Sequence, residues 1–80
     1  MTSEERQAYI RAVVIAIYND EPESARVPTG EWGVIASWMD RGIPLATVLQ
    51  TIEQMDKHPS VMYVRDAVEI EEERRLRALG

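Results

Sequence analysis

Apolar residues recur along this chain with the spacing of amphipathic helices, in four separate segments. In the first segment, the apolar residues at relative positions 0, 3, 4 and 7 are Ile10, Val13, Val14 and Ile17. This spacing places them on one helical face. The β-branched residues of the segment also fit a buried strand. The apolar period is longer than two, however, and favours a helix over about residues 3–19.

The second segment, residues 30–41, is apolar around most of its circumference. Its apolar residues are Trp32, Val34, Ile35, Ala36, Trp38 and Met39. At the helical rotation per residue they cover an arc of roughly 200°, which is wider than one neighbouring helix can bury. We therefore predict either that this helix is the central one of a bundle or that part of its surface is a binding site.

Gly42 and Pro44 separate the second helix from the third. Gly42 suits a left-handed conformation after a helix, and Pro44 is tolerated at a first helical position. The third helix is predicted over residues 44–57. Its narrow apolar stripe comprises Leu45, Val48, Leu49, Ile52 and Met55. The fourth helix is predicted over residues 60–79, after a stop at His58-Pro59 and a cap at Ser60.

The fourth helix changes character along its length. Its inward positions are apolar in the first half, at Val61, Val64, Ala67 and Val68. Charged residues take these positions over the last two turns, so this end is predicted to project beyond the core. Glu71 with Arg75 and Glu73 with Arg77 have i, i+4 spacing. Each such pair stabilises a solvated helix by about 0.2–0.5 kcal/mol.

The expected fold is therefore all-α, a small bundle of four helices in one domain spanning residues 1–80. Residues 19–29 form a linker loop, because this acidic stretch has no periodicity and contains Pro22 and Pro28. Val27, its one large apolar residue, is predicted to hold the loop against the core. Thr2 and Glu5 have the spacing of a capping box at the start of the first helix.

Composition excludes several classes of protein. With 80 residues, 45% of them apolar, the chain folds as one domain rather than staying disordered. It has no membrane-length apolar run and no basic start followed by an apolar stretch, so we expect a cytoplasmic protein without membrane contact. The net charge of −5 disfavours direct binding to nucleic acid, since that relies on lysine and arginine at the phosphates.

Candidate catalytic chemistry is scarce. The chain has no cysteine and one histidine, His58, which is expected to cap a helix or lie exposed. The acidic clusters at residues 20–23 and 69–73 lack the spacing of a calcium site and are expected to be solvated. We identify no nucleophile–base pair and no glycine loop for phosphate. We therefore expect no catalytic, metal or cofactor site, and no enzyme.

A partner surface is a more promising interpretation of the exposed apolar residues. Trp32 and Trp38 lie six residues apart and cannot share one narrow stripe. Either both are core residues of an enclosed helix, or Trp38 lines a groove for another helix, since tryptophan is enriched at interface hot spots. The candidate interface residues are Val34, Trp38, Ile15, Tyr63, Arg65, Leu76 and Leu79.

The stretch from Trp38 to Val68 resembles the DnaD-like replication module. That module has a tryptophan-bearing helix, a short turn, an aliphatic helix and a Tyr-Ile-x-x-Ile-Leu helix; here the last part is Tyr63-Val64-Arg65-Asp66-Ala67-Val68, with the same spacing. Trp38 followed by Gly42-Ile43-Pro44-Leu45 also resembles small uncharacterised bacterial helical proteins. The resemblance implies a replication or DNA-processing setting, with four positions to test: Tyr63, Val64, Arg65 and Val68.

Three functions are compatible with these patterns. The first is a protein–protein interaction module that binds another protein or itself. The second is a DnaD-like accessory module whose basic strip comprises Arg65, Arg74, Arg75 and Arg77. The third is an acidic decoy that inhibits a DNA-binding protein by presenting the carboxylates of Glu71–Glu73 in place of phosphates. We rank them in this order, with an enzyme last.

Overall fold

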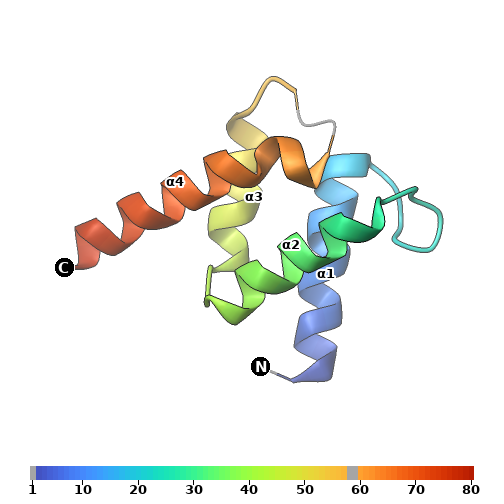
Figure 1. The fold of residues 1–80 in the computed structure, drawn as a ribbon, viewed down its shortest axis with the longest axis horizontal. Helices are drawn as coiled ribbons and strands as arrows, with labels where there is room; N and C mark the ends of the chain where they lie inside the picture. Colours follow the sequence, from blue (N-terminus) through green and yellow to red (C-terminus); the bar gives the residue numbers. More distant parts are fainter. Residues whose placement is uncertain (1, 58–59) are drawn as a thin grey trace.

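The computed structural model describes residues 2–57 and 60–80 and contains helices but no strand in these ranges (Figure 1). The helices are α1 (Ser3–Tyr18), α2 (Thr29–Asp40), α3 (Leu45–Gln54) and α4 (Val61–Leu79). The prediction of a small all-α bundle of four helices is confirmed. The expectation for His58 lies outside the described residues.

Local signals in the sequence fix where the helices begin. The Thr2 hydroxyl accepts a hydrogen bond from the Glu5 amide at 3.1 Å, which satisfies one of the free amides of α1. The Ser60 hydroxyl does the same for the Tyr63 amide of α4, also at 3.1 Å. Both caps are among the predicted ones, and a threonine or serine cap stabilises a helix by about 1 kcal/mol.

The turn after α2 is equally specific. Gly42 has φ +73°, the left-handed conformation predicted for it. Its amide donates to the Met39 carbonyl, and the Ile43 amide donates to the Trp38 carbonyl, both at 3.0 Å. These two bonds form a Schellman motif, which satisfies carbonyls at the helix C-terminus. Ile43 follows directly and is buried, so the turn also carries the chain back into the core.

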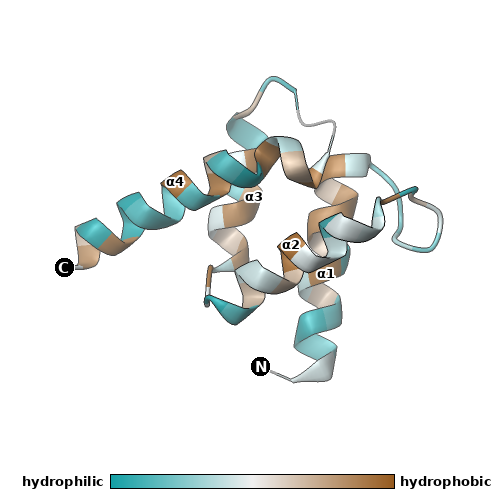
Figure 2. Cartoon of the chain, in the orientation of Figure 1, coloured by the Kyte–Doolittle hydropathy of each residue, from teal (hydrophilic) through white to brown (hydrophobic). Residues whose placement is uncertain are grey.

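The helices form a closed ring in which α1 packs on α2 and α3, and α4 packs on the same two (Figure 1). Figure 2 shows the hydrophobic residues concentrated where the helices meet. The buried apolar residues are Tyr9, Val13, Val14, Ile17, Ile35, Trp38, Met39, Ile43, Val48, Ile52, Val61, Val64 and Val68. The wide apolar arc of α2 thus packs against two helices, α1 and α4. The prediction that α2 is the central helix is wrong, because α2 forms one side of the ring.

Two predicted boundaries need correction. α3 spans Leu45–Gln54, because Met55 is already extended (φ −89°, ψ 134°), so the helix is four residues shorter than the predicted 44–57, and three of these lie at its C-terminal end. The α1–α2 connection spans residues 19–28, and Thr29 already belongs to α2. Val27 is half-buried and packs against the core, as predicted for this loop. Figure 1 also confirms that the C-terminal part of α4 projects beyond the other helices.

Candidate functional site

One buried carboxylate joins three helices at one end of the bundle. The Oε1 atom of Glu31, in the first turn of α2, accepts hydrogen bonds from the Tyr18 hydroxyl of α1 and from the Val61 amide of α4. The second of these bonds is 2.7 Å long. We call Tyr18, Glu31 and Val61 the Glu31 junction. Its carboxylate lies at the N-termini of two helices, where helix dipoles favour negative charge.

The chemistry of the Glu31 junction is that of a structural link. Burial and the hydrogen bond to Glu31 raise the pKa of Tyr18 to about 12, so its hydroxyl is a donor and not a base at neutral pH. Glu31 is itself buried. The carboxylate therefore already has its donors and little access to a substrate, which fits a positioning role for α4.

A second buried carboxylate, Glu72, lies where α4 leaves the core. Its two oxygens accept hydrogen bonds from Arg75 on the next turn, at 2.6 Å to Nε and 2.9 Å to Nη2. These hydrogen bonds, with further attraction to the guanidinium groups of Arg75 and Arg41, hold the pKa of Glu72 below its ordinary value against the opposing effect of burial. Burial, together with the negative charge of Glu72, raises the pKa of Tyr9 to about 12.

Tyr9 ties α1 to the corner between α2 and α3. Its hydroxyl donates to the Ile43 carbonyl at 2.8 Å, in the interior of the fold. On the outside of the same corner, Arg41 pairs with Glu69 of α4 at 3.0 Å. Together these contacts fix the corner against α1 on one side and α4 on the other, so the projecting part of α4 starts from a rigid base.

The arginines of α4 are paired with acidic residues of the same helix. Arg74 lies 3.0 Å from Glu71, and Arg77 lies 2.7 Å from Glu73. The predicted pair of Glu73 and Arg77 is confirmed. The predicted pair of Glu71 and Arg75 is wrong, because Arg75 turns toward the buried Glu72, and Glu71 takes Arg74 one residue earlier. The arginines of the same helix thus neutralise the acidic cluster. The prediction that the whole cluster is solvated is wrong for Glu72, which is buried.

The predicted interface residues do not form one surface. Trp38 has no exposed surface and Val34 is half-buried against the core, so the prediction that Trp38 lines a surface groove is wrong and its alternative, a core residue, is correct. The wide arc of α2 is apolar because it faces two helices. Arg65 is half-buried on α4, 3.7 Å from Glu69 and 3.5 Å from Asp66.

The exposed apolar residues lie on α1 and α4. Ile15 is on the outer side of α1, and Tyr63 is near the start of α4. Leu76 and Leu79 lie one turn apart at the other end of α4, about 20 Å along the helix from Tyr63 at 1.5 Å per residue. We call residues 72–79 the α4 end. Figure 1 shows it on the far side of the molecule from α1.

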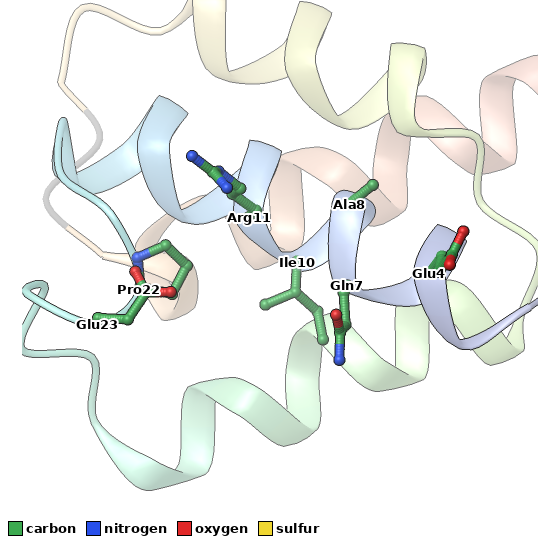
Figure 3. A pocket seen from close by; sticks show the side chains of 7 residues that line it. All are labelled: Glu4, Gln7, Ala8, Ile10, Arg11, Pro22 and Glu23. Carbon is green, nitrogen blue, oxygen red and sulfur yellow. The ribbon is translucent and has the colours of Figure 1, made fainter.

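A hollow on the opposite side of the molecule was missed by the sequence patterns. It has a volume of about 500 Å³ and lies between α1 and the loop that follows it (Figure 3). Its lining residues, which we call the α1 groove, are Glu4, Gln7, Ala8, Ile10, Arg11, Pro22 and Glu23. Ile10 belongs to the predicted core stripe of α1 but is only half-buried, because its side chain also lines this groove.

Several kinds of site are absent from the described residues. Residues 2–57 and 60–80 contain no group of three or more acidic or histidine side chains placed to hold a metal ion. Within the same ranges, the helices are too short or too polar to cross a lipid bilayer. Comparison of the chain with protein-family models, curated proteins and solved structures gave no match.

Proposed function

We propose that this chain is a non-catalytic protein–protein interaction module that binds a second copy of itself through the α4 end. The observation that carries the proposal is the exposure of Leu76 and Leu79, at 53% and 72%, on a segment that projects from its own core. Complete burial of a leucine side chain contributes about 1.5–3 kcal/mol. Two such residues, one turn apart on a helix, give an association surface a hydrophobic centre.

The rigid base of the α4 end supports the same interpretation. α4 is fixed at its start by the Glu31 junction and at its middle by the contact between Arg41 and Glu69. Its last turns are supported by the pairs of Glu71 with Arg74 and Glu73 with Arg77. A helix that is ordered before binding loses little conformational freedom on association, which favours affinity.

The other two functions have less support. A DNA-associated module of the DnaD-like kind needs a strip of free cations, but each of Arg74, Arg75 and Arg77 pairs with a glutamate of α4. An acidic decoy needs free carboxylates in the same segment, and the same ion pairs occupy those. The apolar end of α4 is not engaged in any such pairing, and therefore self-association is the function that the geometry supports best.

The proposal is tested by the mass of the protein in solution as a function of concentration. Sedimentation equilibrium of the intact chain is expected to show a mass above the 9.1 kDa of one chain at high concentration. The double variant Leu76→Glu with Leu79→Glu is expected to keep the mass of a single chain. Because both residues lie outside the core, its stability should change by less than about 0.5 kcal/mol.

Met62→Glu is the matched control, since Met62 is an apolar residue of the same helix with 46% exposure but lies outside the α4 end. This variant is expected to associate like the wild type. A wild-type chain that remains a monomer at about 1 mM, where association worth roughly 4 kcal/mol is still visible, contradicts the proposal. So does a Leu76/Leu79 variant that associates as tightly as the wild type.

A further inference from the structure

We draw no further inference here: the strongest candidate, the α1 groove between α1 and the loop that follows it, carries none because nothing in the structure shows what covers it.

Discussion

The two buried glutamates of this molecule, Glu31 and Glu72, are buried to a similar extent, but their hydrogen-bond donors lie at very different distances along the chain. Only 4% of Glu31 and 3% of Glu72 is exposed. Glu31 takes its hydrogen bonds from residues 13 and 30 positions away, on two other helices. Glu72 takes its hydrogen bonds from Arg75, three residues further along the same helix. The hydrogen bonds of Glu31 therefore join separate helices, whereas those of Glu72 stay within α4 and are supplemented by an attraction to Arg41 at the end of α2.

The difference follows from what surrounds each carboxylate. Glu31 lies between two helix N-termini, whose free amides need acceptors and whose dipoles favour an anion. Glu72 lies within α4, beyond its first turn, where each backbone amide has a partner in the same helix, so a side chain must supply the donors. A buried charge thus binds distant elements together where backbone donors are free, and otherwise recruits a cation from its own helix.

Loss of the Glu31 carboxylate is expected to have the largest effect on stability. Glu31→Ala leaves the Val61 amide and the Tyr18 hydroxyl without their acceptor, at a cost of about 3 kcal/mol in the free energy of unfolding. This is a large share of the roughly 3–5 kcal/mol expected for a domain of this size. Urea denaturation at low temperature measures it.

Glu31→Gln keeps an acceptor and removes only the charge, so it should cost less than Glu31→Ala and remain measurable even if the alanine variant does not fold. Glu53→Ala, at an exposed position of α3, serves as the control. Equal effects of Glu31→Ala and Glu53→Ala would show that the Glu31 junction does not stabilise the tertiary fold.

Removal of one donor to Glu31 is expected to have an intermediate effect. Tyr18→Phe deletes the hydroxyl and leaves the bond from the Val61 amide, which should cost about 1 kcal/mol. Tyr63→Phe removes an exposed hydroxyl and should cost little, as measured in the same urea experiment. If the two variants have the same stability, the hydrogen bond between Tyr18 and Glu31 contributes nothing.

The pH dependence gives an independent check on Tyr18. Folding raises its pKa from 10.0 to about 12, so its contribution is complete below pH 10.0 and is lost as the pH rises toward 12. The stability of the wild type should therefore decline over this range, and that of Tyr18→Phe should decline less. Tyr9, whose pKa is also raised to about 12, accounts for the remaining decline.

Loss of the Glu72 charge is expected to have the smallest effect. Glu72→Gln removes the charge that pairs with Arg75 but keeps an oxygen that can accept one of its hydrogen bonds, and Arg75 is itself partly exposed, so the expected cost is below about 1 kcal/mol. Because folding lowers the pKa of Glu72 below 4.5, its contribution is present above pH 4.5 and is lost as the pH falls through the lower folded value.

The difference in unfolding free energy between wild type and Glu72→Gln should therefore shrink below pH 4.5, as measured by urea denaturation at successive acidic pH values. If Glu72→Gln costs as much as Glu31→Ala at neutral pH, the contrast between a local and a tertiary carboxylate is wrong.

Local rules account for most of what the sequence predicts correctly. The periodicity of Val13, Val14 and Ile17 and the cap at Ser60 depend on neighbours within one or two turns, and both agree with the structure. The burial of Glu31 depends on an amide 30 residues away, and no local pattern encodes that distance. The wide apolar arc of α2 correctly predicts that more than one neighbour covers this helix. It does not distinguish a second helix of the same chain from an external partner, so the sequence leaves both interpretations of Trp38 open.

The same reasoning explains why the surface features of the molecule were only partly predicted. Leu76 and Leu79 follow a charged stretch, and this local change in composition correctly indicates that they lie outside the core. The α1 groove is formed by α1 together with a loop, and its shape depends on where Pro22 lies once the chain has folded. Because that loop has no periodicity, the sequence contains no signal for the hollow.

The indole of Trp38 is among the largest fully buried side chains of this small protein. Its Nε1 is buried without a hydrogen-bond acceptor among the described residues. An unsatisfied donor costs about 1–3 kcal/mol, so the fit of the bicyclic ring against its neighbours must contribute more than that. The chain contains no phenylalanine that could fill space without a polar atom. At this position the indole therefore contributes its volume and its apolar contacts, and its Nε1 donates no hydrogen bond to another described residue.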